Sequence, residues 1–135
     1  MKGLNDYLQS ALSGWAGVLL FASGLAMPYL LRRSPGARSP YLRRMWPHYW
    51  LGYLAFFASF AHAWFAMRSG NMRGMNLSGV WIATLALFVI LWQIGVGLLL
   101  RDPAQSKRRS LRRLHFWTMA FVAGLIVIHI AFNRP

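Results

Sequence analysis

The chain has 135 residues, of which 57% are hydrophobic and only 13% charged, and its formal net charge at pH 7 is +13. Both fractions lie far from the averages of soluble proteins, so we expect lipid to be the solvent for most of the chain. The sequence has no cysteine and only two acidic residues, Asp6 and Asp102, which excludes disulfides, iron–sulfur clusters, thiolate zinc sites, covalently attached c-type haem and carboxylate metal cages.

Four apolar runs follow one another along the chain, each about 20 residues or longer, which is enough to cross the hydrocarbon core of a bilayer. Arg32 and Arg33 end the first run as a stop, so we expect a retained span and not a cleaved signal peptide. Pro28 should loosen the last turn of this helix, and Pro47 suits the first turn of the next. The prediction is an all-α membrane protein, a single domain over residues 1–135 that forms a four-helix transmembrane bundle. The expected spans are residues 4–31, 47–67, 77–100 and 112–132.

Cationic residues are distributed unequally between the two sides that such an alternating bundle would have. The loops after the first and third runs lie on one side and carry eleven Lys and Arg, against four on the other side. The positive-inside rule therefore predicts a multi-pass protein of the bacterial inner (cytoplasmic) membrane, with both basic loops cytoplasmic and both termini extracytoplasmic. We attribute the net charge to this topology, and nucleic acid is not an expected partner.

The histidines of the chain are His48, His62, His115 and His129, two pairs with the same internal spacing of fourteen residues. At about 100° per residue, fourteen steps fall roughly 40° short of four full turns, so the two histidines of a pair face the same way, about 21 Å apart along the axis. The second and fourth helices run parallel in the predicted topology, which pairs the histidines by depth, His48 with His115 and His62 with His129. Two stacked bis-histidine haem groups between these two helices are what such ladders would require.

Two other interpretations of the histidines remain open. A lone histidine in a helix is usually a packed residue bonded to a carbonyl, but polar groups in hydrocarbon are costly and usually functional, and four matched ones are hard to obtain by chance. Another metal or a chlorophyll-type pigment could also use imidazole. Pigment magnesium normally needs a single imidazole, so the facing pairs favour haem.

Glycines and arginines provide the expected surroundings of the two haems. Glycine opens space where a flat macrocycle approaches the backbone, and ordinary close packing of membrane helices is the alternative explanation. By depth, we expect Gly14, Gly17 and Gly79 beside the outer haem, and Gly95 and Gly97 beside the inner one. Arginines can bind haem propionates, or they can anchor the bundle at anionic lipid headgroups. The expected propionate ligands are Arg43, Arg44, Arg112 and Arg113 for the cytoplasmic haem, and Arg68, Arg73 and Arg134 for the outer one.

Paired histidine ladders on the second and fourth spans resemble those of the di-haem b-type membrane cytochromes. The resemblance covers about residues 10–132 and is closest to the N-terminal bundle of the cytochrome b of quinol-oxidising bc complexes, while ferric-reductase-like membrane domains share the ladder. It implies that the four histidines are axial ligands of two non-covalent haem b groups, and that the haem iron carries electrons across the membrane. The chain has no glutamate, and therefore lacks the acidic quinol-site motif of the bc-type cytochromes; it also lacks the flavin/nicotinamide domain of ferric reductases.

The expected function is therefore transmembrane electron transfer, as a subunit or partner of a respiratory or other redox complex. One alternative is a minimal quinone- or metal-reducing oxidoreductase, in which polar residues of the spans serve a ligand; another is a non-redox pigment-binding or scaffold subunit. The expected partners are membrane lipid and either redox proteins or a quinone pool, within a larger complex or a homo-oligomer. The polar candidates for a ligand site are Ser59, Thr84, Gln93 and Thr118.

Overall fold

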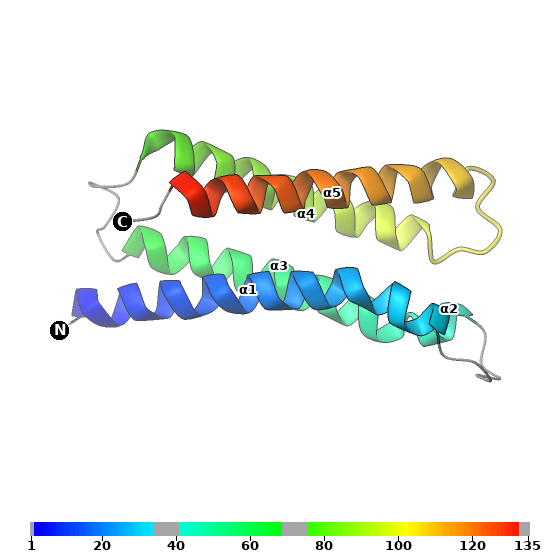
Figure 1. Ribbon diagram of the computed structural model, residues 1–135, viewed down its shortest axis with the longest axis horizontal. Coiled ribbons are helices and arrows are strands. Elements are labelled where there is room, and N and C mark those ends of the chain that lie inside the picture. Colours follow the sequence, from blue (N-terminus) through cyan, green and yellow to red (C-terminus); the bar gives the residue numbers. More distant parts are fainter. Residues whose placement is uncertain (1, 34–40, 69–75, 133–135) are drawn as a thin grey trace. The chain divides into compact units, whose positions relative to one another are not determined.

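The computed structural model describes residues 2–33, 41–68 and 76–132, and most of these residues are helical (Figure 1). In these ranges four helices are long and apolar enough to cross a membrane, which confirms the predicted helical membrane fold. The helices are α1 (Lys2–Arg33), α2 (Tyr41–Arg44), α3 (Trp46–Arg68), α4 (Leu77–Leu99) and α5 (Arg108–Phe132). Helix α5 begins before the predicted apolar run, because the arginines that hydropathy excludes from a span are still good helix formers.

The chain divides into two compact units, residues 1–69 and 70–135. In the first, α1 packs along α3, and in the second, α4 packs along α5 (Figure 1). Each unit is thus an antiparallel pair of long helices, which we call the first helix pair (α1 and α3) and the second helix pair (α4 and α5). Both members of each pair are of spanning length, so each pair can cross a membrane and return.

Local side-chain bonds set the ends of α4 and α5. Asn76 is the N-cap of α4, and its side-chain oxygen accepts a hydrogen bond from the Ser78 amide at 3.1 Å. In the loop that follows α4, the Asp102 carboxylate accepts from the Ala104 amide at 2.9 Å, which forms a tight turn. Arg108 then donates to the Asp102 carbonyl at 2.6 Å, so the loop is tied to the first turn of α5.

Buried positions recur at intervals of seven residues on α1 and α4, and on α3 and α5 one buried residue lies seven residues from a half-buried histidine on either side. Seven residues turn the helix through about 700°, so such positions form one narrow row along a helix. Within each helix pair the rows face the partner helix, with small or polar residues on α1 and α4 and with histidine at both ends of the row on α3 and α5. The rows are Ser10, Gly17 and Gly24 on α1; His48, Ala55 and His62 on α3; Gly79, Ala86 and Gln93 on α4; and His115, Val122 and His129 on α5.

Large apolar side chains mostly point outward, the reverse of a soluble protein. Trp81, Phe116 and Trp117 are 68%, 65% and 67% exposed, while Val122 is completely buried. Small residues inside let two helix backbones approach closely, and large apolar residues outside suit a lipid environment. This distribution agrees with the spanning length of the helices. Close contact between the two backbones of a helix pair is therefore what positions the histidines.

Candidate functional site

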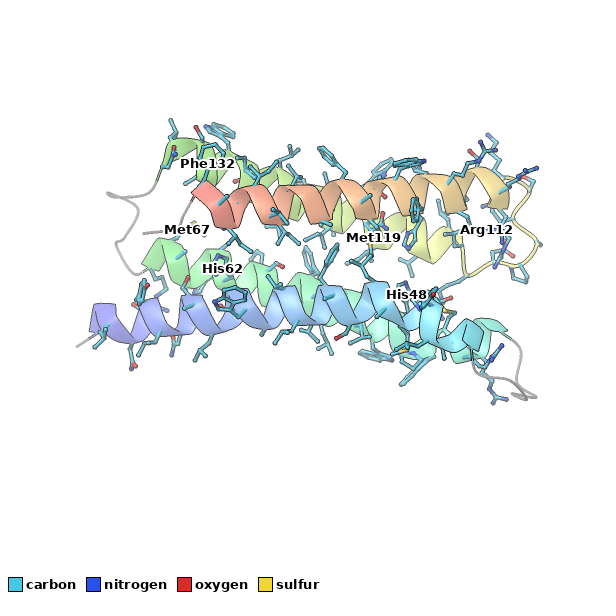
Figure 2. The ribbon with its side chains drawn as sticks, in the orientation of Figure 1. His48, His62, Met67, Arg112, Met119 and Phe132 are labelled. Carbon is cyan, nitrogen blue, oxygen red and sulfur yellow. The ribbon has the colours of Figure 1, made fainter. Side chains whose placement is uncertain are left out.

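Both histidines of α3 are bonded to main-chain carbonyls of α1. They lie toward opposite ends of α3 (Figure 2). The Nδ1–H of His48 donates to the Gly24 carbonyl at 2.9 Å, and the Nδ1–H of His62 donates to the Ser10 carbonyl at 2.8 Å. The Ser10 hydroxyl oxygen lies 3.3 Å from the same nitrogen of His62. The contacts of His48 and His62 with α1 carbonyls therefore also set the register of α1 against α3.

These bonds determine the protonation of the imidazole rings. A carbonyl oxygen can only accept a hydrogen bond, so the nitrogen that faces it must carry the proton. In a neutral imidazole this places the lone pair on Nε2, the other ring nitrogen. Histidines that bind metals usually donate their second nitrogen to a carbonyl or carboxylate in this way, which orients the ring and raises its basicity. His48 and His62 therefore have the tautomer and the outer-shell partner that an axial ligand requires.

The second helix pair repeats this arrangement for His129. Its Nδ1–H donates to the Gly79 carbonyl of α4 at 3.2 Å, which again places the lone pair on Nε2. Gly79 is buried, so its carbonyl is shielded and accepts from the ring away from solvent. His129 thus has the same kind of main-chain support as His48 and His62.

His115 is supported by a polar contact of a different kind, made by Gln93 of α4. Gln93 is only 6% exposed, and its side-chain Nε2 donates to the main-chain carbonyl of His115 at 2.8 Å. This orientation of the amide turns its oxygen toward Thr118, whose hydroxyl donates to it. Gln93 and Thr118 therefore form a buried clamp that joins α4 to α5 at the level of His115.

The polar residues that the sequence offers for a ligand site all make hydrogen bonds within their own helix pair. Ser59 and Thr84 each donate to a carbonyl of their own helix, of Ala55 at 2.8 Å and of Val80 at 2.9 Å. Gln93 and Thr118 do converge, but on each other and on the α5 backbone. Their contacts support a structural role and do not favour a quinone or metal-ion substrate at these four residues.

Two of the expected glycines lie against histidine rings. A Cβ placed on Gly14 would come within 2.8 Å of His62 Nδ1, which is closer than real Cβ atoms approach, and one on Gly97 would lie 3.6 Å from His115 Cε1. Gly17 is close to Ser59, with 3.3 Å between its hypothetical Cβ and the Ser59 hydroxyl, and Gly95 is exposed and would meet nothing within 4 Å. Gly14 therefore makes room for the His62 ring, whereas a side chain at Gly97 would only reach ordinary van der Waals contact with His115.

The expected propionate ligands that the structure describes lie in the first or last turns of their helices or in α2. Arg44 donates from Nη1 to the Leu31 carbonyl at 3.4 Å, near the C-terminal end of α1, where a cation offsets the exposed carbonyls. The exposed arginines of the set are Arg43, Arg68, Arg112 and Arg113, and Arg73 and Arg134 lie outside the described residues. The exposed set can reach anionic groups at a membrane surface, whether these belong to a lipid or to a cofactor.

The sequence carries a signal for the carbonyl partners. Ser10 and Gly24 are fourteen residues apart on α1, and Gly79 and Gln93 are fourteen apart on α4, the same spacing as the histidines they face. Each helix pair thus combines a row of imidazoles with a matching row of small or polar residues. The second row was not recognised from composition, because glycine, serine and alanine are common throughout membrane spans.

Among the described residues, no three His, Cys, Asp or Glu side chains come together as a group that could hold a metal ion. The structure places one imidazole toward each end of α3 and of α5. A carbonyl of the neighbouring helix sets the ring orientation of His48, His62 and His129. Comparison with known proteins leaves the family of this chain open, since no protein-family model, no curated protein and no solved structure matches it.

Proposed function

We propose that the protein is a di-haem membrane cytochrome of the b type that transfers electrons from one face of the membrane to the other. His48 and His115 would hold one haem near the cytoplasmic face, and His62 and His129 would hold the other near the outer face. Haem iron, when bound, supplies one-electron transfer without an open coordination position if both axial ligands are histidine. The chain's own residues bind the groups, orient the ligands and exclude water.

The observation that carries the proposal is the hydrogen bonding of the imidazoles. His48, His62 and His129 each donate from Nδ1 to a carbonyl of the neighbouring helix, which presents Nε2 as the coordinating nitrogen. A packed histidine without a metal role also needs a hydrogen-bond partner. Packing alone, however, does not require that the same ring nitrogen bonds to the same kind of partner at matched positions. The equal spacing of the two ladders and the bonds of these three histidines together support two haem sites.

The remaining residues support the proposal in a consistent way. Gly14 gives space to the His62 ring, and the buried Gln93 holds the backbone of α5 at His115. The exposed arginines Arg112 and Arg113 lie within one helical turn of His115, where they can bind propionates. We further propose that the basic loops lie on the cytoplasmic side of a bacterial inner membrane, and that redox proteins or a quinone pool exchange electrons with the haems.

The test is the haem content of the protein purified in detergent from cells supplied with haem. We expect two b-type haems per chain, both low-spin. His48→Ala and His115→Ala should each abolish the same haem signal, and His62→Ala and His129→Ala should both abolish the other. A purified protein that contains no tetrapyrrole, or that contains a magnesium pigment, would overturn the proposal; four variants that each lose a different signal would overturn the pairing.

A further inference from the structure

Pro28 lies inside α1, four residues after Gly24. In a regular helix the amide of residue 28 would donate to the carbonyl of residue 24, but proline has no N–H and its ring crowds that carbonyl. Gly24 is buried, and a hydrocarbon environment has no water to replace the missing donor. The Gly24 carbonyl therefore needs a hydrogen-bond donor from another helix.

His48 supplies such a donor. Its Nδ1–H lies 2.9 Å from the Gly24 carbonyl oxygen. The other two carbonyls that accept from histidine belong to Ser10 and Gly79. The residues four positions after these, Gly14 and Ala83, are not prolines and keep their amides. His62 and His129 thus share their carbonyls with a helical amide, whereas His48 bonds a carbonyl from which that amide has been removed.

We propose that Pro28 is a positioning residue for His48. By removing the competing amide, it reserves the Gly24 carbonyl for the imidazole, which strengthens the Nδ1–H···O bond and fixes the ring with Nε2 as the coordinating nitrogen. The consequence for haem rests on the function proposed above, but the coupling between Pro28 and His48 does not. Pro28 therefore does more than bend the helix: it creates the acceptor that orients one ligand.

The first experiment needs no haem and compares His48→Phe in two backgrounds of the full chain, with Pro28 and with Pro28→Ala. In the Pro28 background, His48→Phe leaves the buried carbonyl without this donor and should raise the unfolding equilibrium constant on the order of tenfold or more, measured by titration with a denaturing detergent. In the Pro28→Ala background the helical amide takes over, and the loss should be clearly smaller. Changes in packing are common to both backgrounds and cancel in the comparison.

If His48→Phe alone does not fold, the combined Pro28→Ala/His48→Phe chain should recover folded protein. Equal losses in the two backgrounds, or no recovery, would overturn the assignment. Pro47→Ala is the matched control, because Pro47 precedes His48 directly but lies in the first turn of α3, where no carbonyl of α3 awaits its amide. This substitution should leave the effect of His48→Phe unchanged.

The second experiment is a redox titration of the haem-loaded protein. Pro28→Ala should raise the midpoint potential of the haem that His48→Ala removes, because a weaker Nδ1–H···O bond makes the imidazole less electron-donating and favours the ferrous state. The other haem should keep its potential. If the protein binds no haem, the proposed function fails while the folding comparison still decides the role of Pro28. If two haems bind, but Pro28→Ala changes neither the effect of His48→Phe on stability nor the midpoint potential, the proposed role of Pro28 is wrong while the proposed function stands.

Discussion

Addition of a single methyl group at Gly14 should displace the His62 ring. A Cβ there would lie 2.8 Å from His62 Nδ1, 3.1 Å from Cε1 and 3.4 Å from Cγ. Ordinary contacts begin at about 3.5 Å, so the ring must retreat by about 0.7 Å. The ring cannot do this freely, because its Nδ1–H is bonded to the Ser10 carbonyl at 2.8 Å. Gly14→Ala therefore has to stretch this hydrogen bond or separate α1 from α3.

The magnitude follows from three effects. Overpacking costs about 1–3 kcal/mol and the weakened hydrogen bond about 1 kcal/mol, while replacing glycine by alanine in a helix favours folding by about 1 kcal/mol. We expect Gly14→Ala to lower the free energy of unfolding by about 1–3 kcal/mol. Under the proposed function, it should also weaken binding of the outer haem by about tenfold or more, as disturbance of a ligand's outer-shell partner does.

The assay is a denaturing-detergent titration of the haem-free protein, followed by haem titration monitored by absorbance. Gly52→Ala is the control in the same helix pair, because a Cβ there meets nothing within 4 Å. It should stabilise the protein by up to about 1 kcal/mol through helix propensity alone. If Gly14→Ala stabilised the protein as much as Gly52→Ala does, the close approach of His62 to α1 would be refuted.

Two further substitutions test the polar supports. Ser10→Ala removes the hydroxyl acceptor 3.3 Å from His62 Nδ1, so it should slightly raise the midpoint potential of the outer haem in a redox titration. The control Ser23→Ala, at an exposed position of α1, should leave this potential unchanged. A lower potential in Ser10→Ala would contradict the assigned hydrogen-bond direction. Gln93→Leu should lower the free energy of unfolding by about 1–3 kcal/mol, because it leaves the Thr118 hydroxyl and a main-chain carbonyl without their amide partner. In the double variant Gln93→Leu/Thr118→Val the two losses should not add, and strict additivity in the detergent titration would argue against the clamp.

The helices and the histidine ladders could be read from the sequence, because both depend on local periodicity. Runs of apolar residues of spanning length predicted four helices, and the structure has helices over all four. The fourteen-residue spacing of His48 and His62 depends only on the regular turn of a helix, so it also needed no tertiary information. The pairing of α3 histidines with α5 histidines stays a prediction from the sequence.

The surroundings of each histidine depended on the tertiary structure. Pro28 was expected only to loosen the end of a helix, and its relation to His48 became visible once the Gly24 carbonyl was seen to accept from that ring. Gln93 and Thr118 carried no sign of converging, since they are on different helices and neither belongs to a motif. Gly14 was expected beside a macrocycle and proved to lie against an imidazole ring.

The amino-acid sequence by itself determined that the chain forms four spanning helices and that its imidazoles stand in two matched rows. Only the packing of α1 on α3 and of α4 on α5 decided which carbonyls the imidazoles of His48, His62 and His129 meet, and hence which ring nitrogen carries the proton. The reason is physical: every residue has a main-chain carbonyl, so residue type alone does not determine which carbonyl accepts a hydrogen bond from an imidazole. The partner is selected by the register of two antiparallel helices, which small residues such as Gly14 and Gly17 allow to approach closely.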